Sequence, residues 1–387
     1  MRVRRSGSLI ALGALVALGV GAAGGSAAPV ATSSFTWVVP GQAPSFEWPA
    51  GGQTAVAVAG VGLIEGSPGQ HRVPIASLTK MMTALVVLHD HPLAPGQAGP
   101  TLSLGPEDVA DWKRDVRAGD SAVEVRSGEV LTEYQALEAL LIPSADNIAD
   151  RLASWDAGST AAFVARMNAF ARAFGLTNTG YADPSGLDPR SASTAADEAH
   201  VAAELMADPV ARSIVRRARI NLPVVGVLAN ANPALAVDGI VGVKGGYTSK
   251  AHTCLVTAAF RLHGAALVIS VALGQPDPLT AAHIDEALLQ AASPSLQERS
   301  LLPGAATMSG SDPRLVAVPG TQLPVAIVWP GLAVGVRVAS LPSAGAAALD
   351  GPPAPAEVTV STPWSTLGPY PAGLLPPPGA AGPAARP

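Results

Sequence analysis

The chain has 387 residues, a formal net charge of −5 and only 14% charged residues, which is enough chain for a large core together with a second, smaller unit. The modest negative charge, and the lack of basic clusters after the first 28 residues, argue against nucleic acid as a partner. The single cysteine, Cys254, excludes an intrachain disulfide, and no Cys/His grouping has zinc-site spacing, so we expect neither a metal nor another cofactor.

Residues 1–28 have the pattern of an export signal. Three arginines among the first five residues precede an uncharged apolar run from Leu9 to Ala23, and small residues follow. This order predicts a signal peptide. The alternative is an uncleaved anchor that associates the chain with a membrane, since about 20 apolar residues can just span a bilayer. In both cases we expect the rest of the chain to be extracytoplasmic, in the cell wall or periplasmic space or secreted.

Residues 30–293 are expected to form an α+β domain. The apolar run over 55–64 predicts a buried strand, and residues 76–89 are apolar nearly all round, which predicts a helix in the middle of a domain. Helices followed by an antiparallel sheet are typical of α+β architecture. The further helices are expected over 132–142, 148–154, 161–174 and 281–292, and a hairpin of strands over 253–260 and 265–273.

A small β-rich module is expected over residues 294–367. Its strands are predicted over 314–318, 323–329, 333–338 and 357–360, punctuated by proline and glycine. From residue 368 onward the chain is mainly Pro, Ala and Gly. We expect residues 368–387 to be a disordered tail, because they offer few side chains that could pack.

Ser77-Leu78-Thr79-Lys80 places a hydroxyl and an amine three residues apart at the start of the buried helix. At this spacing both side chains lie on one face. A serine is a poor nucleophile until a base takes its proton, and a buried lysine can serve as that base. The alternative is a helix cap beside a lysine that extends to solvent. Only four lysines occur in the chain, and arginine cannot replace lysine as a base.

Two further segments favour a functional role for the Ser77–Lys80 pattern. Ser144-Ala145-Asp146-Asn147 lies at a break between two predicted helices, where its serine either projects into a cleft or caps a helix. Lys244-Gly245-Gly246 lies on a predicted strand, and it is either a binding segment or a glycine turn beside an exposed lysine. Chance does not readily explain all three segments in this order.

With these motifs the sequence resembles the low-mass penicillin-binding D-alanyl-D-alanine carboxypeptidases. That family orders its motifs as Ser-x-x-Lys, Ser-x-Asn and Lys-Thr/Ser-Gly. The similarity continues through Met167-Asn168, Gly186-Leu187 and Asp238-Gly239-Ile240, and covers most of residues 50–293. It implies a penicillin-binding/β-lactamase-like transpeptidase domain, and the β-rich segment after residue 293 is similar to the C-terminal domain that some members carry. The partners it implies are a peptidoglycan stem peptide ending in D-Ala-D-Ala and β-lactams as covalent inhibitors.

The resemblance also implies roles for individual residues. Ser77 corresponds to the nucleophile, Lys80 to its base, and Ser144 to a proton relay toward the leaving group. Lys244 corresponds to the positive charge that attracts the terminal carboxylate of the substrate. The expected oxyanion hole uses the backbone N–H groups of Ser77 and Tyr247. The substrate-binding positions are then Asp146, Asn147, Lys244, Gly245, Gly246, Tyr247 and Thr248.

Two departures from the family pattern bear on activity. Asp146 replaces the usual asparagine, and an ionised aspartate cannot donate a hydrogen bond and repels a substrate carboxylate. Gly245 replaces a threonine or serine whose hydroxyl contacts that carboxylate, and such a hydrogen bond is worth about 1.5–3 kcal/mol. Two hypotheses follow: a working carboxypeptidase, or a catalytically weakened protein of the same fold that binds cell-wall peptides or partners.

Two other hydrolase classes fit less well. A class A β-lactamase has a Glu-x-x-x-Asn segment between the second and third motifs, but here Glu198 is followed four residues later by Ala202, and Glu204 by Asp208. A Ser-His-Asp hydrolase of the α/β type is disfavoured because the sequence has no Gly-x-Ser-x-Gly elbow. The sequence therefore favours the carboxypeptidase class over both.

Overall fold

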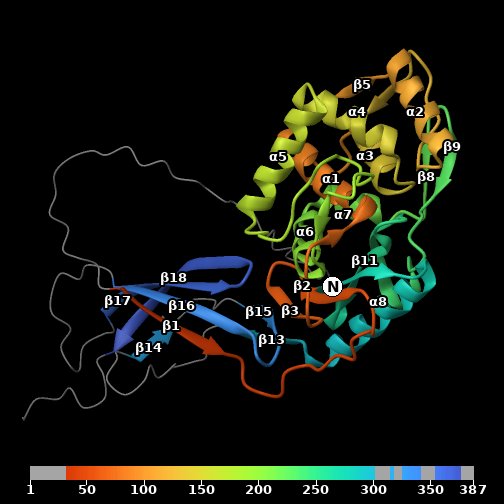
Figure 1. The fold of residues 1–387 in the computed structure, drawn as a ribbon. Coiled ribbons are helices and arrows are strands. Elements are labelled where there is room, and N and C mark those ends of the chain that lie inside the picture. Colours follow the sequence, from red (N-terminus) through yellow and green to blue (C-terminus); the bar gives the residue numbers. More distant parts are fainter. Residues whose placement is uncertain (1–31, 301–313, 318–324, 341–353, 376–387) are drawn as a thin grey trace, which may run out of the picture.

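The computed structural model describes residues 32–300, 314–317, 325–340 and 354–375. A larger α+β domain and a smaller β module make up these residues (Figure 1). The predicted signal peptide over residues 1–28 lies outside them. Within the described ranges, no helix is long and apolar enough to span a bilayer.

A five-stranded antiparallel sheet forms the centre of the larger domain, in the order β10-β11-β12-β2-β3. The single strand expected over 55–64 is wrong, because a turn containing Gly60 (φ +71°) divides it into the hairpin β2–β3. Apolar residues on both sides of this glycine hide the turn from the sequence pattern. The strands are β2 (Gln53–Val58), β3 (Gly62–Gly66), β10 (Ile240–Thr248), β11 (His252–Arg261) and β12 (Ala266–Gln275).

Both faces of this sheet are buried. Ala55 and Ala57 belong to one hydrophobic cluster, whereas Val56 and Val58 belong to another, because successive side chains of a strand point to opposite faces. Helix α6 (Ala195–Ala207) packs on the first face and α8 (Pro278–Ala292) on the second. The domain therefore has three layers, which explains why β2, β11 and β12 are buried over most of their length.

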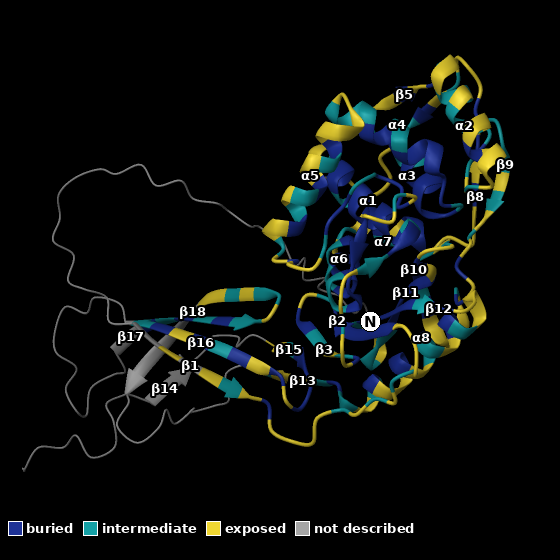
Figure 2. Ribbon diagram, in the orientation of Figure 1, coloured by how far each residue is buried: buried dark blue, intermediate teal, exposed yellow. Residues whose placement is uncertain are grey.

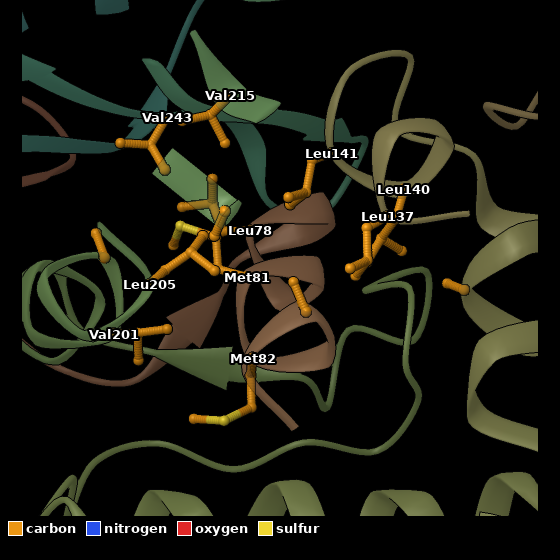
Figure 3. Packing of buried hydrophobic residues seen from close by; sticks show 14 of the residues in the cluster. Leu78, Met81, Met82, Leu137, Leu140, Leu141, Val201, Leu205, Val215 and Val243 are labelled. Atoms are coloured by element: carbon orange, nitrogen blue, oxygen red, sulfur yellow. The ribbon is translucent and has the colours of Figure 1, made fainter. Parts of the chain in front are cut away.

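Helix α1 (Thr79–Asp90) lies in the middle of the helical part and contacts α3, α4, α5 and α6. Figure 3 shows Leu78, Met81 and Met82 among buried side chains from the surrounding elements, including Leu205 and Val243. The prediction of a central buried helix is confirmed. Its first turn differs, because residues 76–78 form the short 3-10 helix η1 (Ala76–Leu78), and Ser77 lies in that turn.

The remaining elements frame this core. The helices expected from the sequence over 132–142, 148–154, 161–174 and 281–292 are present as α3, α4, α5 and α8. Helices α2, α6 and α7 were not expected; α2 is largely polar, and only Val109, Trp112 and Val116 recur in it at helical spacing. The helices not yet bounded are α2 (Pro106–Ala118), α3 (Glu133–Leu141), α4 (Asp146–Ala157), α5 (Thr160–Ala173) and α7 (Pro209–Val215), with η2 (Val237–Gly239), η3 (Leu262–Gly264) and η4 (Ser293–Ser295). Short strand pairs are β4 (Val73–Pro74) with β7 (Ala192–Ser193), β5 (Thr101–Ser103) with β6 (Val130–Thr132), β8 (Arg219–Leu222) with β9 (Gly226–Ala229), and β13 (Gln297–Ser300) with β15 (Val325–Val328).

The β module contains a strand from each end of the described chain. Its sheet has the order β1-β16-β17-β18-β14, and β1 pairs antiparallel with β16 from Thr32↔Ala339 to Val38↔Ala333. The expected domain start at residue 30 is therefore wrong, because residues 32–38 complete the C-terminal sheet. The strands are β1 (Thr32–Val38), β14 (Arg314–Ala317), β16 (Ala333–Ser340), β17 (Ala354–Thr362) and β18 (Ser365–Leu375).

The expected disordered tail is also corrected in part. Residues 368–375 belong to β18, which pairs with both β17 and β14. Backbone pairing with two neighbouring strands does not depend on side-chain identity, so the composition of this segment did not reveal it. The rest of the expected tail, residues 376–387, lies outside the described residues.

The module packs against the larger domain. Trp364, at the turn between β17 and β18, stacks on His200 of α6 with ring centroids 4.5 Å apart and 7° between the ring planes. The Trp364 backbone N–H donates to the Val61 carbonyl oxygen over 3.2 Å. Figure 2 shows buried residues both inside the larger domain and along β16. The hydrophobic cluster under α8 includes Trp329 and Val334, so it continues into the module.

Candidate active site

Ser77 lies at a constrained turn before α1. The preceding residue, Ala76, has φ +49°, a left-handed conformation that costs a non-glycine residue about 1–2 kcal/mol. The pairing of β4 with β7 holds the chain just upstream. Ser77 is half-buried and lines a cleft, whereas Lys80, one turn later, is fully buried. The turn thus places the Ser77 hydroxyl at the surface of the cleft and the Lys80 amine in the interior behind it.

The Lys80 amine makes three short contacts. Its Nζ lies 2.8 Å from Ser77 Oγ, 2.6 Å from Asp146 Oδ1 and 2.9 Å from the Ser185 carbonyl oxygen. An ammonium group donates to all three. A neutral amine donates to Asp146 and Ser185 and keeps its lone pair for the Ser77 proton. The same geometry therefore suits the amine before and after it takes that proton.

Ser185 belongs to a loop whose importance was missed from the sequence. The Asp183 carboxylate accepts hydrogen bonds from the hydroxyls of Ser185 and Ser191 and from backbone N–H groups of residues 186–188. Thr83 of α1 donates to the Pro184 carbonyl oxygen over 2.7 Å. These bonds fix the Ser185 carbonyl oxygen against Lys80. The turn-forming run Asp-Pro-Ser-Gly at 183–186 was the available signal.

Ser144 lies between α3 and α4 with φ +67°, another left-handed non-glycine position. Its side chain is buried and lines the same cleft, and its Oγ has no hydrogen-bond partner among the described residues. Strained backbone and unsatisfied buried hydroxyls are concentrated at functional sites, because the native fold must compensate for them. The Ser144 hydroxyl is therefore available to a bound molecule.

Asp146, at the start of α4, also lines the cleft and is 2% exposed. Burial raises the pKa of its carboxyl above the usual value, and the nearby Lys80 charge acts in the opposite direction. Its neighbour Asn147 faces elsewhere, since its side-chain amide exchanges hydrogen bonds with the backbone N–H and C=O of Val123 over 3.1 and 3.0 Å. Asn147 is absent from the cleft lining, so the structure does not bring this predicted substrate-binding residue into the cleft.

Strand β10 is an edge of the central sheet and borders Ser77. A Cβ atom at Gly246 would lie 2.6 Å from the Ser77 backbone nitrogen, so only glycine permits this approach. Lys244 is 2% exposed, and its Nζ donates to the Gly245 carbonyl oxygen over 2.7 Å. Burial and the positive charge of Lys80 lower the pKa of Lys244 well below its usual value, although Asp146 opposes this shift.

The cleft has a volume of about 650 Å³. Its lining brings together the serine of the first motif, the serine and the aspartate of the second motif, and the backbone of the third motif. Lys80 and Lys244 lie behind this lining, and Asp120 is an additional lining residue that the sequence did not single out. The predicted site residues on the lining are Ser77, Ser144, Asp146, Gly245, Gly246, Tyr247 and Thr248.

A serine hydroxyl within hydrogen-bond distance of a buried lysine defines the class of serine–lysine nucleophile sites. The model of the D-alanyl-D-alanine carboxypeptidase family, peptidase S11, matches residues 59–277. The chain belongs to this family. This stretch contains all three motifs, so the resemblance inferred from the sequence is confirmed.

Several curated relatives are similar over the same region. A Mycobacterium tuberculosis D-alanyl-D-alanine carboxypeptidase, DacB2, is 34% identical over 208 residues, which cover 52% of this chain and 67% of the relative. The Bacillus subtilis carboxypeptidase DacF is 30% identical over 220 residues, or 54% and 52% of the two chains. A Pseudomonas aeruginosa D-alanyl-D-alanine endopeptidase is 38% identical over 125 residues, or 32% and 37%. The match thus spans between about one third and two thirds of these relatives.

Solved structures agree on the fold. The Streptomyces K15 DD-transpeptidase has a TM-score of 0.56 at 24% identity, covering 62% of this chain and 95% of that one. Penicillin binding protein 6B from Escherichia coli has a TM-score of 0.63 at 19% identity, covering 86% and 97%. The expected α+β, penicillin-binding fold is confirmed.

Proposed function

We propose that this chain is an exported serine D,D-carboxypeptidase that removes the terminal D-alanine of peptidoglycan stem peptides through an acyl-enzyme on Ser77, and that penicillin acylates the same serine. The observation that carries the proposal is the 2.8 Å contact between Lys80 Nζ and Ser77 Oγ in a cleft bordered by the other two motifs. The carboxypeptidase relatives match over more of the chain than the endopeptidase relative, which supports the carboxypeptidase reaction.

In the proposed reaction, Ser77 Oγ attacks the carbonyl carbon of the penultimate D-alanine as its proton moves to the neutral Lys80 amine. The tetrahedral intermediate collapses, the peptide C–N bond breaks, and Ser144 relays a proton to the departing amine of the terminal D-alanine. Water then attacks the ester on Ser77, releasing the shortened peptide and restoring the serine hydroxyl. Each step uses groups within the cleft or directly behind it.

The developing oxyanion is proposed to be stabilised by the backbone N–H groups of Ser77 and Tyr247. The close approach of Gly246 to the Ser77 nitrogen supports this assignment, because it holds the two chain segments side by side. Losing one such donor typically lowers the rate by about 10²–10³. The assignment concerns backbone groups, which agrees with the exposed Tyr247 side chain.

Export rests on the signal-like pattern of residues 1–28. An extracytoplasmic location fits a peptidoglycan substrate. The proposed domain arrangement is a catalytic unit and a β module. The catalytic unit lies within residues 30–293 but excludes β1, which belongs to the sheet of the module. The second hypothesis, a catalytically weakened binder, is favoured by Asp146 and Gly245, which depart from the second and third motifs.

Labelling with a fluorescent penicillin tests the acyl-enzyme. The wild-type chain is expected to carry a covalent label that Ser77→Ala abolishes and that the exposed Ser127→Ala control retains. Release of D-alanine from a peptide ending in D-Ala-D-Ala tests the reaction. Label without release supports the weakened binder, whereas absence of any Ser77-dependent label or release contradicts the proposed enzyme.

A further inference from the structure

The proposed reaction needs a base at its second step, the hydrolysis of the ester on Ser77. Water attacks an ester slowly unless a neighbouring group takes one of its protons as the new bond forms. The family pattern has an asparagine at the third position of the second motif, and a side-chain amide does not take up a proton near neutral pH. This chain has Asp146 there. Its carboxylate can accept a proton where an asparagine cannot.

Two short contacts join Asp146 to Ser77. Asp146 Oδ1 lies 2.6 Å from Lys80 Nζ, which lies 2.8 Å from Ser77 Oγ. The two oxygen atoms are therefore at most two hydrogen-bond lengths apart, a span that one water bonded to both can bridge. Asp146 lines the same cleft as Ser77, and its Oδ2 accepts no hydrogen bond from the described residues. This oxygen is therefore available to a water in the cleft.

Three other groups near the ester are less suited to this step. The Lys80 amine is fully buried, does not line the cleft and faces Ser77 Oγ, which is the ester oxygen rather than the carbon that water attacks. Burial raises the pKa of the Cys254 thiol to about 12, so this group is protonated. Asp120 is a second carboxylate of the lining, but it makes no hydrogen bond or ion pair with Lys80.

The surroundings of Asp146 favour proton uptake. Burial raises the pKa of its carboxyl group above the usual value, although the charge of Lys80 acts in the opposite direction. A general base is most effective when its pKa lies close to the working pH, and the ordinary pKa of an aspartate is well below that range. The hydrogen bonds of Lys80 to both Asp146 and Ser77 also provide a route by which the proton can return to the serine.

We infer that Asp146 is the base that activates the hydrolytic water, so that this chain hydrolyses penicillin as well as stem peptides instead of remaining acylated. The carboxylate takes a proton from water as the water oxygen bonds to the ester carbon. The bond from this carbon to Ser77 Oγ then breaks, and Lys80 passes the proton from Asp146 to Oγ. The products are the free serine and an acid, either penicilloic acid or the shortened peptide. This role of Asp146 rests on the proposed acyl-enzyme.

The lifetime of the penicillin label tests this role separately from the rate of acylation. The full chain is labelled with a fluorescent penicillin, free label is removed, and the labelled fraction is followed with time. We expect Asp146→Asn to keep the label about 10²-fold longer than the wild type, the size expected for loss of a general base. The wild type should hydrolyse benzylpenicillin repeatedly, whereas Asp146→Asn should stop after one equivalent.

Hydroxylamine distinguishes a missing base from a distorted site. It is a strong enough nucleophile to attack an ester without help from a base, so it should release the label from Asp146→Asn and from the wild type at similar rates. Slow release from Asp146→Asn in hydroxylamine would mean that the substitution displaces the ester carbonyl group. That result would overturn the role of Asp146 as the base.

Two variants control for the loss of negative charge. Glu107→Gln removes a carboxylate from an exposed position outside the cleft and should leave the label lifetime unchanged. Asp120→Asn removes the other carboxylate of the lining and should prolong the label much less than Asp146→Asn. An effect of Asp120→Asn as large as that of Asp146→Asn would contradict the assignment.

The outcomes separate this role from the proposed function. A label on Ser77 that is equally stable in the wild type and in Asp146→Asn contradicts the role of Asp146 and leaves the acyl-enzyme standing. If penicillin turnover depends on Asp146 but no D-alanine is released from a D-Ala-D-Ala peptide, the role stands and the carboxypeptidase is contradicted. Absence of any Ser77-dependent label in both proteins overturns both.

Discussion

Gly246 packs directly on Ser77: a Cβ atom at position 246 would lie 2.6 Å from the Ser77 backbone nitrogen and 3.2 Å from Ala76 Cβ. The neighbouring Gly245 differs, since a Cβ there would meet nothing closer than Leu255 Cδ1 at 3.5 Å, an ordinary contact. The two glycines of the third motif therefore do different things. Position 246 sets the separation between β10 and the turn that carries Ser77, whereas position 245 has room for a side chain.

Gly246→Ala is expected to push β10 away from the turn that carries Ser77 and to lower the rate of the proposed acylation of Ser77 at least tenfold. The reason is that backbone atoms of Ser77, rather than a flexible side chain, occupy the space of the new methyl group. Time courses of fluorescent penicillin labelling measure the effect. Gly245→Ala adds the same group where space exists and should slow labelling much less; equal losses in both variants would contradict this account.

Ser144→Ala should lower acylation or turnover by about 10²-fold, as expected for loss of a proton relay, with little loss of stability. Its Oγ has no hydrogen-bond partner among the described residues, so removing it breaks no bond within them. Urea unfolding and D-alanine release measure the two effects. Ser144→Gly is the companion variant and should be the more stable of the two by about 1 kcal/mol, because glycine tolerates φ +67°. Full activity of Ser144→Ala would exclude the relay role.

Asn147→Ala is expected to destabilise the fold by about 1–3 kcal/mol, because it leaves the buried backbone N–H and C=O of Val123 without their partner. The midpoint of urea unfolding measures this loss. Peptide affinity of the folded variant should stay within about twofold of the reference, since Asn147 does not line the cleft. A large drop in affinity without a change in stability would restore the substrate-binding role predicted from the sequence.

Glu198 gives a pH-dependent prediction. Burial raises the pKa of its carboxyl to about 8, and the neighbouring Asp197 adds to this shift, while Ser193 opposes it. The pKa of Glu198 is higher in the folded than in the unfolded state, so protonation of this carboxyl group stabilises the fold. The stabilisation is complete below about pH 4.5 and is lost as the pH rises through 8. Glu198→Gln should therefore gain stability relative to the wild type between pH 5 and 8.

Each pKa unit corresponds to about 1.4 kcal/mol, so this relative gain amounts to a few kcal/mol at most. Urea unfolding midpoints of both proteins across this pH range provide the measurement. The exposed Glu65→Gln variant controls for loss of one carboxylate at the surface. A constant difference between Glu198→Gln and the wild type across the range would mean that Glu198 does not titrate differently on folding.

Much of the fold was predictable because it depends on local patterns. The apolar character of residues 76–89, nearly all round, predicted a buried helix, which is observed over 79–90, and the break at Pro143-Ser144 predicted the loop that carries the second motif. The hairpin of β11 and β12 followed from two β-rich runs around a short turn. These features depend on periodicity and turn residues over short windows, which a sequence displays directly.

The rest depends on contacts between distant segments. Asn147 looked like a site residue from its position, yet its amide faces Val123, and one residue along a helix is enough to turn a side chain away from the cleft. The Ser185 carbonyl oxygen, which accepts a hydrogen bond from Lys80, is a backbone group, so the identity of the side chain does not reveal its role. The partner of β1 lies in β16, and no local pattern predicts a pairing over that separation.

That pairing affects how the module can form during synthesis. During synthesis, β1 is among the first of the described residues to be made and β16 is among the last. β1 therefore has no partner strand until nearly the whole described chain has emerged from the ribosome. The larger domain can bury its core before then, because its sheet and helices lie between the two strands. An unpaired strand edge on a growing chain also invites pairing with a neighbouring copy. The module is therefore the part of this molecule whose assembly must wait longest.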